Sequence, residues 1–395
     1  MNQIHYIRQV ISTFTVGMVL AGVLCAAWVT AHAEKPTIDF DNVPGVGHPP
    51  TGRDLYQVSC AACHGVDGSG ASRDRVGFDQ ALPDFTDCNF ATREANLDWI
   101  AVAQEGGPAR AFSPLMPAFG DALTAKQSEA AIDHIRTFCG NDWPRGELNL
   151  PRPLVTTKAF PEDELVVSGN FVTEGLDAID VDVIYEQRFG TRNQAEIIVP
   201  LLWHEQINAN GGTKWKSGVG DIGLGLKRVV FHSLESGSIL SLGGEVLLPT
   251  GNDEDGFGSG TTIFEPYVAY GQLLPRQFFL HTQVGAGIPW DDDKSNEEAF
   301  WRMALGRAFY ENGGYGRRWA PMIELLGARE LVSGADDQWD VVPQIQVTLS
   351  PRQHVRLGFG AKIPINNTAN RRTSCIVYLL WDWFDGGLFQ GWSKE

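Results

Sequence analysis

The chain has 395 residues, which is more than one typical domain needs, and a formal charge of −17 at pH 7. This acidic balance argues against binding to nucleic acid, which depends on basic patches. An ordinary apolar fraction of 43% together with 44 glycines and 12 tryptophans suits a β-rich membrane protein with aromatic girdles better than a soluble enzyme.

Residues 1–33 have the organisation of a signal peptide. Arg8 supplies a positive start, an apolar run follows at 10–29, and Ala31-His32-Ala33 offers a cleavage site. An uncleaved membrane anchor is the alternative, because the apolar run is nearly long enough to span a bilayer. Both interpretations predict an exported chain.

The motif Cys60-Ala61-Ala62-Cys63-His64 has the pattern C-x-x-C-H. Because its two thiols lie one helical turn apart, both can reach the vinyl edge of one porphyrin, and in an exported chain this spacing predicts covalent attachment of a single haem c. His64 can then bind the iron as its proximal ligand. A redox dithiol or half of a zinc site is the alternative, but a zinc site needs a second pair of ligands and the sequence has no second C-x-x-C.

The segment 41–140 that surrounds this motif has a helical pattern. Thr51 is a candidate N-cap of a first helix, a second helix is expected at 92–104, and Thr124 with Gln127 forms a capping box that starts a third. The sequence therefore predicts an all-α domain.

The same segment resembles class I cytochromes c over nearly all of its length. Gly52 and Tyr56 precede the haem motif, Met116-Pro117 lies between the second and third helices, and an amphipathic helix ends the segment. The resemblance implies a cytochrome c domain that carries electrons on a haem iron with two axial ligands.

Met116 is the candidate distal iron ligand. It is the single methionine between the motif and residue 140, and flanking prolines restrict the backbone of its loop. The alternatives are that Met116 fills the core and that His134, which we expect at the surface of the third helix, binds instead. Ligation by His64 and Met116 would fill both axial positions and favour electron transfer over substrate chemistry. Arg110 is a candidate partner of a haem propionate.

The other cysteines are Cys88, Cys139 and Cys375, apart from Cys25 in the leader. Cys88 and Cys139 fall in the same segment and can pair in an oxidising compartment, but sequence separation does not test their geometry, so the pairing stays open. Cys375 would then be a lone thiol that fills space as a small apolar side chain.

Residues 141–164 are rich in proline, with Pro144, Pro151, Pro153 and Pro161. This density predicts a semi-rigid linker. A second domain is expected at 165–386, followed by a short C-terminal tail at 387–395.

From Leu165 onward apolar residues recur with period two, as in Ile222, Leu224 and Leu226. The pattern predicts about 12 strands, with short turns and longer loops in alternation and with tryptophans at strand ends. We expect an antiparallel transmembrane β-barrel in contact with outer-membrane lipid, with its short turns in the periplasm. A secreted β-sandwich is the alternative.

This second part also resembles outer-membrane barrels of the phenol-degradation transporter type. Residues 218–227 and 248–251, a glycine-rich strand and the stretch Leu-Pro-Thr-Gly, carry the resemblance. It implies an outer-membrane channel or transporter.

Together the two parts predict a monohaem c-type cytochrome in the periplasm, tethered to an outer-membrane barrel and exchanging single electrons with a periplasmic redox protein. One alternative is a channel whose cytochrome is a redox sensor or gate. Another is a haem enzyme such as a peroxidase, which needs Met116 to dissociate. The chain has no G-x-S-x-G, phosphate-loop or H-E-x-x-H motif, so we expect no enzymatic activity.

Overall fold

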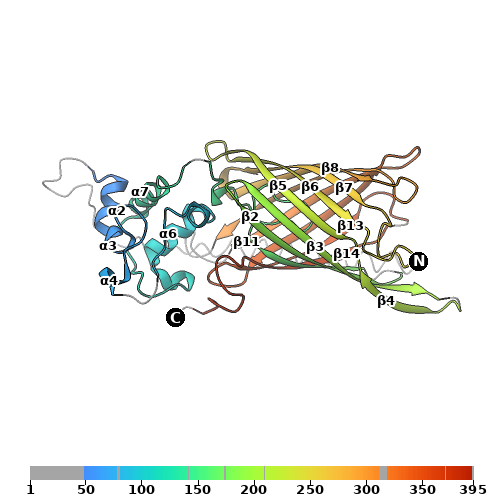
Figure 1. Ribbon diagram of the computed structural model, residues 1–395, viewed down its shortest axis with the longest axis horizontal. Helices are drawn as coiled ribbons and strands as arrows, with labels where there is room; N and C mark the ends of the chain where they lie inside the picture. The colour runs from blue at the N-terminus through green and yellow to red at the C-terminus, as the bar shows by residue number, and fades with distance from the viewer. Residues whose placement is uncertain are drawn as a thin grey trace, which may run out of the picture. The chain divides into compact units, whose positions relative to one another are not determined.

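The computed structural model describes residues 49–77, 81–140, 142–172, 175–208, 210–310, 318–369 and 371–393. The expected signal peptide at 1–33 lies outside these residues. The described chain begins with short helices and continues as a large antiparallel sheet (Figure 1). No helix in these ranges is both long enough and apolar enough to cross a membrane.

The helical part is built from short elements joined by irregular segments. Its α-helices are α2 (Gly52–Ser59), α3 (Ala61–His64), α4 (Arg73–Val76), α5 (Cys88–Ala91), α6 (Asn96–Glu105) and α7 (Ala125–Arg136), and its 3-10 turns are η2 (Gly107–Arg110) and η3 (Gly146–Leu148). The expectation of an all-α domain is confirmed in part, because a helical region is present but much of it is irregular.

Two of the three predicted helix starts are confirmed by their capping bonds. The Thr51 hydroxyl accepts from the backbone N–H of Asp54 at 3.3 Å, and the Thr124 hydroxyl accepts from that of Gln127 at 3.2 Å. The prediction that a helix begins at Thr92 is wrong. The Thr92 hydroxyl instead donates to the Cys88 carbonyl at 2.6 Å, which closes α5, and α6 begins only at Asn96.

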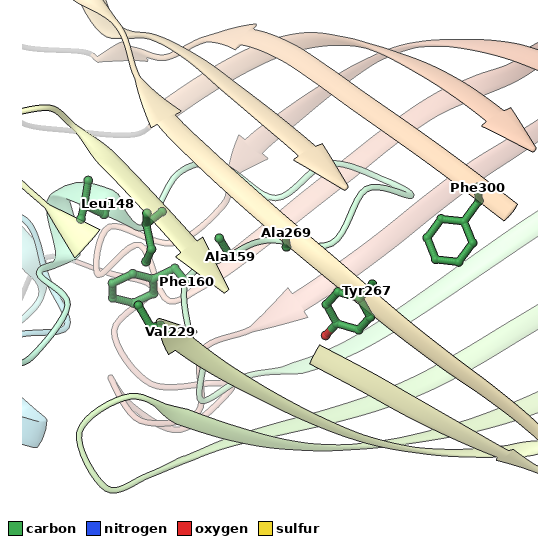
Figure 2. Close-up of a cluster of buried hydrophobic side chains, with 8 residues drawn as sticks. Leu148, Ala159, Phe160, Val229, Tyr267, Ala269 and Phe300 are labelled. Carbon is green, nitrogen blue, oxygen red and sulfur yellow. The ribbon is translucent and has the colours of Figure 1, made fainter. Parts of the chain in front are cut away.

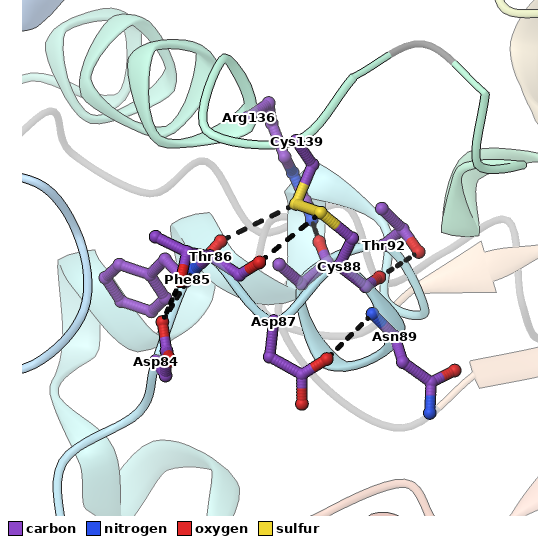
Figure 3. Close-up of a disulfide and its surroundings, with 10 residues drawn as sticks. Asp84, Phe85, Thr86, Asp87, Cys88, Asn89, Thr92, Arg136 and Cys139 are labelled. Carbon is purple, nitrogen blue, oxygen red and sulfur yellow. Dashed lines mark hydrogen bonds between the residues drawn. A yellow bond between two sulfur atoms is a disulfide. The ribbon is translucent and has the colours of Figure 1, made fainter. Parts of the chain in front are cut away.

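A disulfide between Cys88 and Cys139 resolves the pairing that the sequence leaves open. The two Cα atoms lie 5.6 Å apart, and the bond joins α5 to the residues that follow α7 (Figure 3). It closes a loop with a sequence separation of 51 residues. In the chain-entropy model such a cross-link stabilises the folded state by about 4 kcal/mol.

The second part is a closed antiparallel barrel. Within the described ranges, twelve strands pair in order around the ring: β1 (Leu165–Val172), β2 (Ala178–Phe189), β3 (Asn193–Ile207), β5 (Ile222–Ser233), β6 (Ser238–Leu248), β7 (Ile263–Leu273), β8 (Phe278–Pro289), β9 (Glu298–Arg307), β11 (Arg318–Glu330), β12 (Gln338–Thr348), β13 (Val355–Pro364) and β14 (Ser374–Trp381). The first strand pairs with the last, in the register Leu165 to Trp381, and this pairing closes the ring. The predicted number of strands is confirmed.

The connection after β3 contains a strand of its own. Residues 213–219 form an additional strand, β4 (Thr213–Val219), which pairs with the second half of β3, and the short β10 (Phe309–Tyr310) similarly adds to β11. Between the two strands, Asn208 exchanges backbone and side-chain bonds with Gly212, and Gly211 takes a φ of 77°.

The side chains of the barrel alternate between an apolar outer face and a polar inner face. Leu226, Val284 and Ile323 point outward and are 63%, 59% and 51% exposed. On the neighbouring inward positions, Glu324 is fully buried and Lys227 is 4% exposed. This arrangement is the reverse of a soluble sandwich, whose apolar faces meet in the middle.

Residues 149–163, here called the luminal segment, lie against the inner face of the barrel. Leu150 packs with Phe279 and Met322, while Phe160 belongs to a cluster with Val229 (Figure 2). The sequence predicts a spacer here, but most of these residues are in contact with strands. The proline density predicts a stiff backbone and does not indicate where that backbone lies.

We expect the purified chain to remain folded in cold sodium dodecyl sulfate and to migrate differently on a gel after boiling. A closed barrel satisfies its backbone hydrogen bonds internally and therefore resists detergent until it is heated. Equal mobility of boiled and unboiled samples would contradict the closed barrel.

Candidate haem-binding site

The helical break between α2 and α3 places the two thiols of the C-x-x-C-H motif. Cys60 ends α2 and begins α3, and its carbonyl accepts from the backbone N–H of Cys63 at 3.1 Å and from that of His64 at 2.9 Å. Both thiols are free and half-buried. Burial, with a smaller contribution from Cys63, raises the pKa of the Cys60 thiol to about 11, so it is protonated at neutral pH.

The His64 ring is half-buried, and its surroundings favour the neutral imidazole. It stacks on Phe85 with ring centroids 4.7 Å apart, and burial lowers its pKa below the ordinary value. Among the described residues its Nδ1 atom has no hydrogen-bond partner. A neutral imidazole has a free lone pair, which is the form that binds iron, and the residues at the motif therefore fit a haem.

Tyr56 fixes the turn that follows His64. Its side chain is fully buried, and its hydroxyl donates to the Gly65 carbonyl at 2.6 Å. Burial raises the pKa of Tyr56 to about 12, so the hydroxyl keeps its proton for this bond. Gly65 adopts a φ of 77°, which a side chain would disfavour.

The walls of the site are apolar and come from several helices. Tyr56, Ala61, Phe85 and Ile135 form one buried cluster, with Cys60, Phe90, Trp99 and Phe138 packed against it. A second cluster of Leu55, Leu123 and Ala131 adjoins Phe119 and Ala130. An apolar surrounding of this kind disfavours charge on the iron and is one way in which a protein sets the potential of a haem.

The loop that carries Met116 is held by close contacts with two glycines. The backbone N–H of Gly107 donates to the Met116 carbonyl at 3.0 Å. A Cβ atom on Gly107 would lie 2.2 Å from the Ser113 carbonyl oxygen and 3.2 Å from the Met116 Cβ, and one on Gly106 would lie 3.1 Å from the Met116 carbonyl oxygen. The loop geometry is thus closely determined, and the role of Met116 as distal ligand stays a prediction.

Two other candidates from the sequence have protein partners. His134 is partly exposed, with its ring centroid 5.5 Å from that of Tyr56 and 5.3 Å from that of Phe138, so its ring is packed against other aromatic side chains. Arg110 is buried and donates to the Asp98 carboxylate at 2.7 Å, so its guanidinium is engaged by the protein.

Sequence reasoning misses Phe85 and the role of Gly107. Phe85 lies in a segment without regular secondary structure, where periodicity gives no signal. The pair Gly106-Gly107 is recognisable in the sequence as the end of a helix, but its close approach to the Met116 loop depends on tertiary contacts.

Comparison with protein families assigns both parts of the chain. Residues 47–135 match the family described as "Cytochrome C oxidase, cbb3-type, subunit III". Residues 167–374, more than half of the chain, match the family described as "Putative MetA-pathway of phenol degradation". The chain belongs to this family. At its N-terminus it carries a cytochrome c-type domain, so both resemblances are confirmed.

Several solved structures are similar to part of the chain. An outer membrane channel from Pseudomonas putida F1 shares 14% identity, with 55% of this chain and 94% of that one covered and a TM-score of 0.39. The NanC porin shares 9% identity, with 55% and 97% covered and a TM-score of 0.37. The KdgM porin shares 8% identity, with 55% and 98% covered and a TM-score of 0.36. No curated protein matches the chain.

We expect Gly107→Ala to destabilise the helical part by about 2 kcal/mol, because the added Cβ collides with the Ser113 carbonyl. Thermal unfolding of the full chain, followed by near-ultraviolet circular dichroism, measures the effect. Gly140→Ala is the matched control, since no described atom lies within 4 Å of its added Cβ. Identical unfolding midpoints for the two variants would contradict the close packing of the Met116 loop.

Proposed function

We propose that this protein transfers single electrons at the outer membrane through one haem c bound covalently by Cys60 and Cys63, with His64 and Met116 as axial ligands of the iron. The main support is the half-buried His64 ring, stacked on Phe85, directly after two free thiols on one helical turn. A haem in this site supplies an iron that changes its charge by one electron.

The residues around the site support electron transfer over catalysis. His64 and Met116 would occupy both axial positions and so leave no place for a substrate. Tyr56 and Phe85 hold the His64 turn and ring in a fixed position, which limits the rearrangement that accompanies a change of iron charge. The proposal therefore includes no enzymatic reaction.

The surface of the barrel supports a membrane location. Large apolar side chains are exposed on strands around the ring, including Val167, Ile197, Leu226, Leu242, Val268, Val284, Leu305, Ile323, Phe359 and Leu379. Contiguous apolar surface on this scale has to be covered, and for a closed barrel with a polar interior the natural cover is lipid. Together with the exported character of the sequence, this supports the outer membrane.

The path of the chain supports a periplasmic cytochrome. Leu148 and Leu150 pack beside the ends of strands that are joined by short turns, such as Val229 of β5 and Phe279 of β8. The chain therefore enters the barrel at its short-turn end, which in outer-membrane barrels is periplasmic. The helical part precedes this entry point.

Exposed apolar side chains next to the proposed ligands support a protein partner. Val66, two residues after His64, is 69% exposed, and Leu115, directly before Met116, is 47% exposed. Apolar side chains at the edge of a redox site suit brief contact with a periplasmic electron carrier.

A channel gated by its cytochrome is the second candidate function. One observation favours it: the luminal segment, which connects the cytochrome to β1, lies inside the barrel. A change in the cytochrome could therefore reach the interior of the barrel through the chain itself.

We expect the full chain to retain haem on a denaturing gel and the double variant Cys60→Ser, Cys63→Ser to lose it, because only a thioether survives denaturation. A peroxidase-based haem stain measures this. Cys375→Ser is the matched control and should stain like the unaltered chain, since Cys375 lies on the outer face of β14. Staining of the double variant would remove both thiols from the proposal.

We expect Met116→Ala to lower the reduction potential and to allow carbon monoxide to bind the reduced iron, because the distal position opens. Potentiometric titration and the absorption spectrum under carbon monoxide measure the two effects. His134→Ala should change neither property. An unchanged potential without carbon monoxide binding would show that Met116 is not a ligand.

A further inference from the structure

The inner space of the barrel contains the luminal segment at its short-turn end. We propose that residues 149–163 form a plug that closes the barrel to ions and small solutes. This inference goes beyond electron transfer and does not depend on the haem. It rests on three sets of contacts between the segment and the barrel wall, and on contacts within the segment itself.

The first set centres on Glu324 of β11, which points inward and is fully buried. Its carboxylate accepts from the backbone N–H groups of Leu154 at 2.9 Å, Val155 at 3.1 Å and Thr156 at 2.8 Å. It also accepts from the Thr156 hydroxyl at 2.6 Å. Four hydrogen bonds from three successive residues converge on this one side chain, so it holds this part of the segment in one conformation.

The second set of contacts joins the segment to strands around the ring. Arg152 donates to Glu164 at 2.6 Å and to Glu186 of β2 at 3.2 Å, and its carbonyl accepts from the Tyr378 hydroxyl of β14 at 2.9 Å. On other strands, Ser241 of β6 donates to the Ala159 carbonyl at 2.6 Å, and Gln283 of β8 accepts from the backbone N–H of Thr157 at 3.1 Å. Because these partners come from strands on different sides of the barrel, the segment crosses the lumen and does not follow one wall.

The third set is apolar. Leu150 is 4% exposed among Phe279, Ala308, Ala320 and Met322. Phe160 is 1% exposed and shares a cluster with Val229, Ile239 and Tyr267, as Figure 2 shows in part. Side chains this deeply buried are in contact with protein on nearly all sides, so they leave little space for a column of water beside the segment.

The segment is also folded on itself. Lys158 forms an ion pair with Glu162, and its ammonium group donates to the Asn149 side chain at 2.6 Å. The Lys227 ammonium group of β5 donates to the Lys158 carbonyl at 2.9 Å. Lys158 and Glu162 are only 3% and 4% exposed. A tether in solvent has no need to pair its charges, whereas a plug that buries charged groups has to provide partners for them.

The test is the conductance of planar lipid bilayers that contain the purified full chain. We expect the unaltered chain to be nearly non-conducting. Replacing residues 151–160 by the same number of alternating glycines and serines keeps the tether but removes the contacts with the wall. This variant should increase the mean conductance at least about tenfold, since an emptied barrel of this size leaves a wide lumen.

Glu324→Gln is a second, milder variant. It keeps the shape of the side chain but replaces one of its two acceptor oxygens with a donor, so we expect frequent brief openings. Ile323→Val is the matched control, because Ile323 is the outward neighbour of Glu324 and is 51% exposed, and its traces should stay quiet. The mobility shift on boiling confirms that each variant is folded.

The proposal is overturned if the unaltered chain conducts as well as the glycine–serine variant, or if that variant is folded and stays closed. If the glycine–serine variant does not fold, the conductance of Glu324→Gln tests the proposal. Openings that are absent from the Ile323→Val control support a plug, and quiet traces from both overturn it.

Discussion

The structure depends on the pairing of β1 with β14. A strand in a bilayer cannot leave its backbone groups without partners, and the register from Leu165–Trp381 to Val172–Ser374 satisfies both edges of the sheet at once. Closure also separates the interior of the barrel from the lipid that surrounds it. Because inward positions carry residues such as Glu186 and Gln346, any segment that enters this interior has to offer hydrogen bonds of its own.

Local features of the barrel are predictable from the sequence, and distant contacts are not. The period-two alternation of Ile222, Leu224 and Leu226 depends only on the pleat of one strand, so the strands and their number follow directly. The place of the luminal segment depends on partners far along the chain, such as Gln344, which is 190 residues from Leu154. No pattern within residues 149–163 reports such a contact.

In the candidate haem site, too, local features are predictable from the sequence and distant contacts are not. The motif from Cys60 to His64 and the caps at Thr51 and Thr124 are local, and the sequence identifies each of them. Thr92 misleads because its hydroxyl has two ways to bond with nearby backbone, and it closes a helix instead of opening one. The contact of Phe85 with His64 arises only when an irregular segment folds back on the motif, so no periodicity predicts it.

The bond from Tyr378 to the Arg152 carbonyl has a consequence for how the molecule is assembled. These two residues are 226 positions apart, and Arg152 is synthesised before any strand of the barrel. The bond between them can therefore form only after the final strand has been synthesised. For these residues the order of synthesis and the order of burial are opposite.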